Sequence, residues 1–491
     1  MDNNTLKTAK KSKQHSQHDN INNAATGTGG KDRLSPLPDF LLGNILSRLH
    51  LDSAAATSVL SQRWRGLWAR FRTSVILDCH RFPPSTTTFS CCSGSTRGFL
   101  TIIDHILRQL NSRQIFHFNL CIMYPLENDE RELCSQLLQS WLQIFCRRNL
   151  KEIKVKLDSN SCGYQGPLIP LPTSIFQCSS LIVLELKGNF DCKLPENKVI
   201  ALPNLKKLDI DLPAFNNGFI GTLITLLKSC PLLEILILAL EFLVDEFVVY
   251  ICAPNLKTFR ASMSGTSHRS RFLIDASKLI HVTIDGMLAF YSFVHQQDTL
   301  QVANIAFDSD IFESGSDYLS SIFELIGGIS SIRFLQLSDN LALFNIFNHM
   351  NANAFWPIFR NLTKLRLEGP SRDYVNERAP IPTCVLKKLK WVKITEIDGD
   401  DSDIEFLKYI LQHADVLKKL IVSIYVNIGV SEGEDGEREQ LWMEYKCCRA
   451  LFDFPKRSLG CEIVFYGGYI TEASSKDLKD DLLASKISYF K

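Results

Sequence analysis

A six-residue pattern of apolar and polar positions, apolar-x-x-apolar-x-apolar, recurs along most of the chain. Successive copies start 21 to 32 residues apart. The eleven starts are Leu150, Leu181, Leu205, Leu233, Leu256, Leu279, Leu300, Ile332, Leu362, Leu389 and Leu417. Each copy predicts one short strand, with its fourth and sixth residues buried and the residues between them exposed. A single copy cannot bury its apolar side, so we expect stacked copies that form a solenoid of parallel strands joined by helices or loops.

Residues 32–78 follow a helical pattern instead. Two apolar stripes have helical spacing: Leu42, Ile45, Leu46 and Leu49, and then Trp64, Leu67, Trp68 and Phe71. With a short helix expected near residues 54–56, this segment predicts three helices around a very small core. Such a core cannot hide two tryptophans and many leucines, so the pattern indicates a face that is buried against another protein.

A further helix is predicted after an acidic run near residue 400. Its apolar side carries Ile404, Leu407, Leu411 and Ala414. Ser402 and Glu405 have the spacing of a capping box, which predicts that Ser402 caps this helix. The acidic run suits a helix N-terminus, where negative charge is favourable, and it lacks the glycine and the distal glutamate of a calcium loop.

Composition narrows the classes of protein that the chain can represent. Of its 491 residues, 45% are hydrophobic and 22% charged, and the formal net charge is +1. A near-neutral chain has no overall bias toward nucleic acid or anionic membranes. The most hydrophobic run, residues 231–253, contains acidic residues and is a poor membrane span, and the first thirty residues lack the apolar stretch of a signal peptide. We therefore expect an intracellular protein, nuclear or cytoplasmic, that binds neither nucleic acid nor membrane.

The sequence offers no catalytic, cofactor-binding or metal-binding residues. It contains no glycine-rich phosphate loop, Gly-x-Ser-x-Gly, His-Glu-x-x-His or Cys-x-x-Cys motif, so we expect a non-catalytic protein. The 15 cysteines should stay reduced inside the cell. Four of them, which lie shortly before a repeat start, should be buried beside the core: Cys178, Cys230, Cys252 and Cys384.

The helical segment at residues 31–78 resembles a plant F-box. The similarity rests on the runs DRLSPLPDFLLGNILSRL and ATSVLSQRWRGLW, with their Leu-Pro-Asp opening and Arg-Trp-Arg close. The intervening His50-Leu51-Asp52 departs from the commoner Pro-Thr-Lys type, which affects a turn rather than the apolar stripe. Farther on, the repeats at about residues 100–380 have the approximate period of leucine-rich repeats.

The C-terminal part, residues 381–467, resembles the FBD region of plant F-box proteins. The similarity rests on the runs PTCVLKKLKWVKI, DDSDIEFLKYILQHADVLKKLIV and CEIVFYG. These resemblances imply an α/β fold: a three-helix F-box, an irregular leucine-rich-repeat solenoid, and an FBD-like region that continues and caps the repeats. Residues 1–30 and 468–491 are expected to be tails, the first of them disordered.

The resemblance also implies a function. An F-box protein of this kind is expected to be the substrate-recognition subunit of an SCF-type (Skp–cullin–F-box) ubiquitin ligase. Its F-box docks a Skp-type adaptor and, through it, cullin, while its repeats bind a substrate protein that the sequence does not identify. The resemblance assigns adaptor docking to nine residues: Leu37, Pro38, Leu42, Ile45, Leu46, Val59, Leu60, Trp64 and Trp68.

Substrate binding is expected on the exposed side of the strands, where the strand rule also places Asp209. Large apolar side chains at such positions are the informative ones, and they suggest Ile235, Ile237, Phe334 and Trp391 as anchors. Loops between repeats that fold over these residues would be the alternative explanation. Two other functions stay open: a repeat scaffold that works without a ligase, and an F-box receptor that senses a small molecule.

Overall fold

The computed structural model describes residues 34–79, 93–123, 126, 128–157, 168–193, 199–212, 218–242, 247–265, 270–286, 290–306, 316–338, 359–369, 381, 383–425 and 434–473. The predicted tail at residues 1–30 lies outside the described residues. Part of the other predicted tail is described, because residues 471–473 form a strand.

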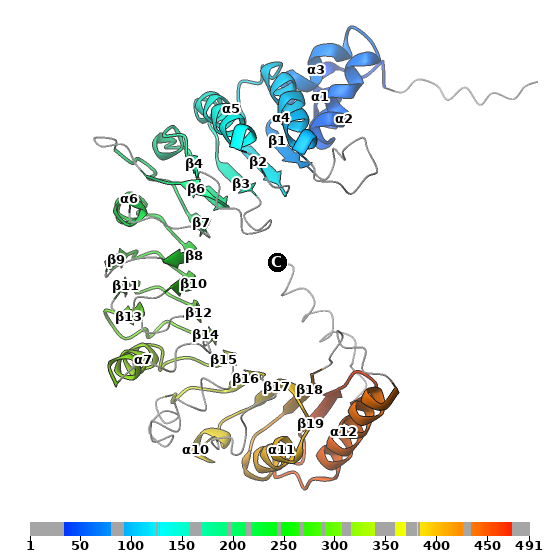
Figure 1. The fold of residues 1–491 in the computed structure, drawn as a ribbon, viewed down its shortest axis with the longest axis vertical. Helices are drawn as coiled ribbons and strands as arrows, with labels where there is room; N and C mark the ends of the chain where they lie inside the picture. Colours follow the sequence, from blue (N-terminus) through cyan, green and yellow to red (C-terminus); the bar gives the residue numbers. More distant parts are fainter. Residues whose placement is uncertain are drawn as a thin grey trace, which may run out of the picture.

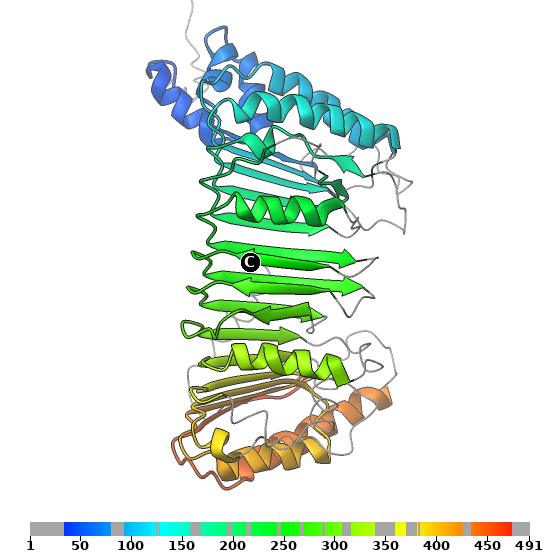
Figure 2. The same ribbon diagram turned by 90° about the vertical axis from the view of Figure 1, so that its left-hand side faces the viewer.

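Fifteen of the described strands form one curved sheet that follows the order of the chain (Figure 1). Its strands are β1 (Ser74–Asp78), β2 (His117–Ile122), β3 (Glu152–Leu157), β5 (Val183–Lys187), β7 (Lys207–Leu212), β8 (Ile235–Phe242), β10 (Thr258–Gly265), β12 (His281–Gly286), β14 (Val302–Ala306), β15 (Phe334–Ser338), β16 (Lys364–Glu368), β17 (Trp391–Ile397), β18 (Lys419–Ile424), β19 (Glu462–Tyr466) and β20 (Thr471–Ala473). All neighbours pair in parallel except β19 and β20, and Figure 2 shows the strands side by side. The predicted α/β solenoid of parallel strands is confirmed.

The repeated pattern explains why these segments become strands. Each of the eleven predicted starts is buried and leads into one strand, from β3 to β18. In β8, for example, Leu236 and Leu238 at the fourth and sixth positions are fully buried, whereas Ile235 and Ile237 are half-buried. Alternate side chains therefore build a continuous core, and the others line the opposite face of the sheet.

Helices and two small sheets cover the outer side of the curve (Figure 1). The helices are α4 (Ser93–Arg108), α5 (Asn128–Cys146), α6 (Gly218–Lys228), α7 (Ser316–Gly328), α10 (Thr383–Leu386), α11 (Asp401–His413) and α12 (Glu434–Asp453), with the 3-10 turn η4 (Ile175–Gln177). The small sheets pair β4 (Ile169–Pro170) with β6 (Phe190–Asp191), and β11 (Arg271–Asp275) with β9 (Val248–Cys252) and β13 (Tyr291–Phe293). The half-buried strand positions consequently face the concave side.

The predicted burial of the cysteines is only partly correct. Cys178 and Cys230 are buried, but Cys252 is exposed. Cys252 ends β9, a strand of the outer small sheet in which alternate side chains point to solvent. The side chain of Cys384 lies outside the described residues.

The N-terminal helices pack directly onto the first strands. They are α1 (Asp39–Arg48), α2 (Leu51–Ala56), the 3-10 turns η1 (Thr57–Val59) and η2 (Trp64–Gly66), and α3 (Leu67–Phe71). Buried Arg72 donates hydrogen bonds from Nη1 to the carbonyl oxygens of Leu46 (3.1 Å) and Leu49 (2.7 Å), which holds the end of α1. Burial lowers the pKa of Arg72. The carbonyl of Ala69 accepts from the Ser112 hydroxyl at 2.8 Å, so α3 is joined to the chain that enters β2.

The N-terminus of α11 differs from its prediction. The helix starts at Asp401, and Asp400 is its N-cap, accepting the backbone N–H of Asp403 at 2.7 Å. The buried Asp403 carboxylate in turn accepts the N–H of Gly399 at 2.9 Å. The capping role predicted for Ser402 is therefore wrong, because the helix begins earlier. The prediction that the acidic run forms a helix N-terminus is confirmed.

Candidate functional site

The helical head exposes large apolar side chains although its own core is already filled. Leu34 is exposed in the loop before α1, and the other exposed residues, here called the head surface, are Phe40, Leu41, Ile45, Leu49, Val59 and Leu60. The most exposed is Val59, at 87%. Since monomeric proteins rarely leave large apolar side chains clustered in water, this surface is a candidate contact for another protein.

The head surface overlaps only partly with the nine residues expected at the adaptor. Ile45, Val59 and Leu60 belong to it, Pro38 is also exposed, and Leu37 is half-buried. The other four are inside the chain's own core, with exposed fractions of 0 to 8%: Leu42, Leu46, Trp64 and Trp68. Trp68 also donates from Nε1 to the Ser58 hydroxyl at 2.9 Å. These four side chains therefore shape the head from inside, and only the small part of them that remains exposed is accessible to a partner.

Three residues of the head surface were not predicted as adaptor contacts: Phe40, Leu41 and Leu49. For Leu41 and Leu49 a signal exists in the sequence. Leu41, Ile45 and Leu49 have i, i+4, i+8 spacing, next to the inward pair Leu42 and Leu46. A helix that is apolar on two sides needs two partners, and the chain itself supplies only one of them.

Arg63 was also missed, and it holds the loop that precedes α1. Its guanidinium donates to Asp39 Oδ1 from Nε (2.9 Å) and Nη2 (2.7 Å), to the carbonyl of Ser35 from Nη1 (2.6 Å), and to the carbonyl of Leu37. The segment containing Leu37 and Pro38 is thereby fixed against the later part of the head. Arg63 is thus a positioning residue for this loop.

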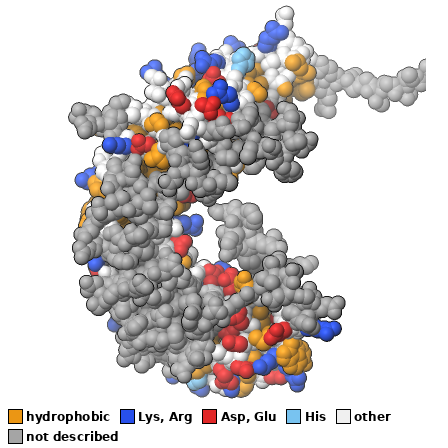
Figure 3. All heavy atoms as spheres, viewed as in Figure 1, with side chains coloured by type: hydrophobic (Ala, Val, Ile, Leu, Met, Phe, Trp, Pro, Cys, Tyr) orange, Lys and Arg blue, Asp and Glu red, His pale blue; other side chains and the backbone are white. Residues whose placement is uncertain are grey.

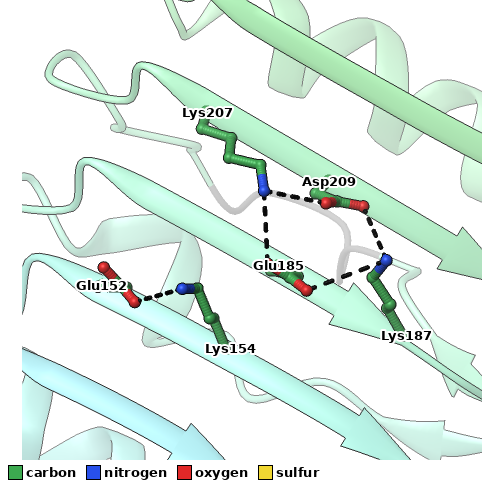
Figure 4. A network of polar contacts seen from close by, with 6 residues as sticks. All are labelled: Glu152, Lys154, Glu185, Lys187, Lys207 and Asp209. Atoms are coloured by element: carbon green, nitrogen blue, oxygen red, sulfur yellow. Dashed lines mark hydrogen bonds and ion pairs between the residues drawn. The ribbon is translucent and has the colours of Figure 1, made fainter. Parts of the chain in front are cut away.

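The concave face of the sheet is the second candidate surface, and its first strands are charged (Figure 4). Lys207 lies 3.1 Å from Asp209 and 3.5 Å from Glu185, and Lys187 lies 3.6 Å from Asp209 and 3.9 Å from Glu185. Asp209 is buried beneath these lysines, which corrects its expected exposure. Burial lowers the pKa of Lys207, but the carboxylates of Asp209 and Glu185 outweigh it and raise that pKa above its usual value. In this part of the face the charges largely satisfy one another.

The four predicted substrate anchors form two separate pairs. Ile235 and Ile237 are half-buried on β8, where Ile237 stands in register between Asp209 and Arg260. Phe334 and Trp391 are half-buried on β15 and β17, with ring centroids 6.0 Å apart and ring planes at 82°. Four strand spacings, about 19 Å along the sheet, separate β8 from β15. The two pairs therefore do not share one patch.

The described residues also contain a cavity of about 430 Å³ on the outer side, between α5 and η4. It is lined by Gln139, Gln143, Cys146, Arg147, Pro172, Thr173, Ser174 and Gln177. Ligand pockets are usually lined by apolar and aromatic side chains, and this lining is mostly polar. Within the described part of the chain, no three His, Cys, Asp or Glu side chains lie close enough to hold a metal ion, and no helix is long and apolar enough to cross a membrane.

Comparison with known proteins assigns three regions of the chain to protein families. The model of the F-box domain matches residues 34–74, that of the LRR repeats of FBD-associated F-box protein At5g56370 matches residues 138–293, and that of FBD matches residues 377–422. F-box/LRR-repeat protein 13 of Arabidopsis thaliana is 27% identical, covering 82% of this chain and 91% of that protein. F-box/FBD/LRR-repeat protein At1g78750 of the same plant is 25% identical, covering 90% of this chain and 97% of that protein. The resemblances expected from the sequence are confirmed.

Proposed function

Because the chain matches the models of an F-box, of leucine-rich repeats and of an FBD region, we propose that it is the substrate-recognition subunit of an SCF-type ubiquitin ligase. Regions of these kinds are typically non-catalytic adaptor modules. In this proposal the F-box binds a Skp-type adaptor, through which cullin is reached, and the concave face binds a substrate protein.

The head surface is the observation that carries the proposal. A side chain such as Val59 loses favourable burial energy of about 1.5–3 kcal/mol when it stays in water, and several such residues lie on the same small module. Leaving these side chains in water is unfavourable for the isolated chain. Their burial against a partner would be favourable. A match to the F-box model over residues 34–74 makes a Skp-type adaptor the partner that best fits this surface.

The proposed mechanism requires no covalent chemistry from this chain. A substrate held on the concave face is tethered to the complex, which raises the effective concentration of its lysines near the ubiquitin-charged enzyme. The two surfaces therefore have separate tasks: the head surface joins the ligase, and the exposed side chains of the strands select the substrate.

Adaptor binding can be tested with a double substitution on the head surface. Val59→Glu with Leu60→Glu places charges at two strongly exposed positions, so the fold should be retained. Binding to a purified Skp-type adaptor should fall by at least about 30-fold, since losing one interface hot spot typically costs about 2 kcal/mol. Leu459→Glu is the matched control, because Leu459 is 93% exposed and far from the head in the sequence.

A second variant tests the opening loop. Leu37→Ala with Pro38→Ala should abolish co-purification of the adaptor if these residues are contacts. Undiminished adaptor binding by both folded double mutants would defeat the assignment of the head surface. Failure of the unaltered chain to bind any Skp-type adaptor would instead favour a repeat scaffold that works without a ligase.

Substrate binding is tested by Ile237→Asp with Phe334→Asp, one from each apolar pair. Proteins captured during proteasome inhibition should be lost from this variant, while the adaptor should remain. Retention of all captured proteins would remove these two residues from the proposed substrate surface.

A further inference from the structure

Cations on the concave side are distributed unevenly along the array. In the strands from β3 to β10 most of them pair with neighbouring carboxylates, and among the described residues only the exposed Lys156 and Arg260 of these strands lack such an ion pair. The pairs are Lys154 with Glu152, Lys187 and Lys207 with Glu185 and Asp209, and Lys206 and Lys257 with Glu234. This part of the face therefore attracts a charged ligand only weakly.

The strands from β15 to β18 have the opposite character at their N-terminal ends. Arg333, Lys364, Lys390 and Lys418 are all exposed there, and none of them forms an ion pair with another described residue. They occupy four successive strands, as three backbone hydrogen bonds show. The N–H of Thr363 donates to the carbonyl of Arg333 (3.0 Å), the N–H of Lys390 donates to the carbonyl of Thr363 (2.8 Å), and the N–H of Lys418 donates to the carbonyl of Lys390 (2.8 Å). Thr363 holds the equivalent position before β16 and Lys364 follows it by one residue, so the four cations extend over three strand spacings, about 15 Å.

Acidic residues lie at the other ends of two of these strands. Glu368 ends β16, and Glu396 and Asp398 lie at the end of β17 and just after it. Figure 3 shows acidic side chains on this lower arm of the curve. β16 and β17 thus run from a positive edge to a negative edge, and the cations at the positive edge remain able to attract an anion.

An aromatic pair adjoins the cations. Lys364 is in register with Phe334 on one side and with Trp391 on the other. The two rings nevertheless meet at a centroid distance of 6.0 Å, and both remain half-exposed. A ligand at this edge can therefore pair its negative charges with the cations and place an apolar group against the rings.

We propose that this edge, formed by Arg333, Phe334, Lys364, Lys390, Trp391 and Lys418, binds an acidic segment of the substrate protein that carries an aromatic or large aliphatic side chain. The proposal rests on the function proposed above and names the class of substrate. An extended segment of about five residues spans the four cations, at roughly 3.3 Å per residue.

The edge fits a polypeptide better than a nucleic acid. Binding of a single strand typically uses several aromatic platforms for successive bases, whereas this edge offers one aromatic pair in which an edge-to-face contact already covers one ring face. An apolar side chain needs only the remaining exposed part of the rings. Charge complementarity at an open surface also gives specificity and fast association without a deep pocket.

The test uses the full chain bound to its adaptor and short fluorescent peptides. The probe is a glutamate-rich peptide with one central tryptophan, compared with a lysine-rich version, a version with serine in place of tryptophan, and a uridine oligoribonucleotide of equal charge. The glutamate–tryptophan peptide should bind best, and its binding should weaken as salt shortens the screening length from about 10 Å at 0.1 M toward 3 Å at 1 M.

Charge reversal locates the binding. Lys364→Glu with Lys390→Glu should lower affinity for the acidic peptide by at least about 10-fold. Arg113→Glu with Lys228→Glu is the control, since it changes the same charge at exposed positions on other elements. Four results would overturn the proposal. They are no binding of the acidic peptide, equal binding of the lysine-rich peptide, tighter binding of the RNA, and equal losses of affinity in both variants. Adaptor binding is measured on the same samples, so its failure would count against the ligase function alone.

Discussion

Replacing Arg63 by alanine should weaken adaptor binding while leaving the helical head folded. The Arg63 guanidinium holds the loop before α1 through Asp39 and the carbonyls of Ser35 and Leu37. Its side chain is 39% exposed, and that of Asp39 is 50% exposed. Arg63 therefore lies outside the buried core formed by Leu42 and Trp68, and its loss should free the loop rather than the helices.

The size of the effect follows from the contacts. An ion pair as exposed as that of Arg63 with Asp39 contributes about 0–1 kcal/mol, and each hydrogen bond to a carbonyl about 0.5–1.5 kcal/mol. Together they order the loop by about 2 kcal/mol. If the adaptor recognises the ordered loop, the loop of Arg63→Ala has to become ordered on binding. The free energy of this ordering corresponds to about a 30-fold weaker affinity.

Isothermal titration with a purified Skp-type adaptor measures this difference, and thermal unfolding checks that the head is intact. Arg65→Ala is the matched control, because Arg65 lies two residues away, is exposed and has no comparable contacts. Arg63→Lys should recover only part of the affinity, since one ammonium group cannot reproduce the fork of guanidinium contacts. Equal affinities for Arg63→Ala and Arg65→Ala would refute the reasoning.

Two further predictions concern the stability of the array. Fully buried Glu444 on α12 accepts the N–H groups of Gly468 (2.8 Å), Tyr469 (3.0 Å) and Ile470 (3.1 Å), so Glu444→Ala should ease opening of the β19–β20 hairpin by about 2–4 kcal/mol. Hydrogen exchange in this hairpin measures the opening, and unchanged exchange would contradict the prediction. Burial raises the pKa of Asp211, although the charge of Lys187 opposes this shift. The charged carboxylate therefore lowers the stability of the fold at pH 7. This penalty fades as the pH falls toward 3.8, the ordinary pKa of an aspartate. Asp211→Asn should therefore raise the unfolding temperature at pH 7 and not near pH 4; an equal effect at both pH values would exclude this cause.

Most strands could be predicted from the sequence where the alternation of apolar residues was intact, although β2 was missed despite an intact pattern at Ile115, Phe118 and Leu120. The pattern at Leu233 gives β8 with its expected buried positions, because side chains of a strand alternate between two faces. β1 escaped prediction because Arg72 occupies the first position of its pattern, where an apolar residue is expected. The structure buries Arg72 against backbone carbonyls, and this compensation cannot be seen in linear spacing.

The candidate surfaces were harder to predict, because burial depends on packing between distant segments. Trp64 and Ile45 both belong to helically spaced apolar stripes, yet only Trp64 is buried in the head's own core. Likewise, Arg333 and Lys390 are 57 positions apart in the chain and come to one edge only because their strands stack. Spacing along one strand predicts which face a residue takes, but not which neighbours neutralise or cover it.

The stacking also fixes how the two surfaces are related. The head is joined to the array through α3, where the Ala69 carbonyl accepts both the N–H of Asn111 (3.2 Å) and the hydroxyl of Ser112 (2.8 Å). From β1 onward the parallel pairing continues strand by strand to β16 and beyond, a path of ten strand spacings or about 48 Å along the sheet. Separation between the proposed adaptor and substrate contacts is thus set by the number of repeats rather than by a linker. For tethering, this means that the reach to substrate lysines depends on where the bound segment lies in the substrate itself.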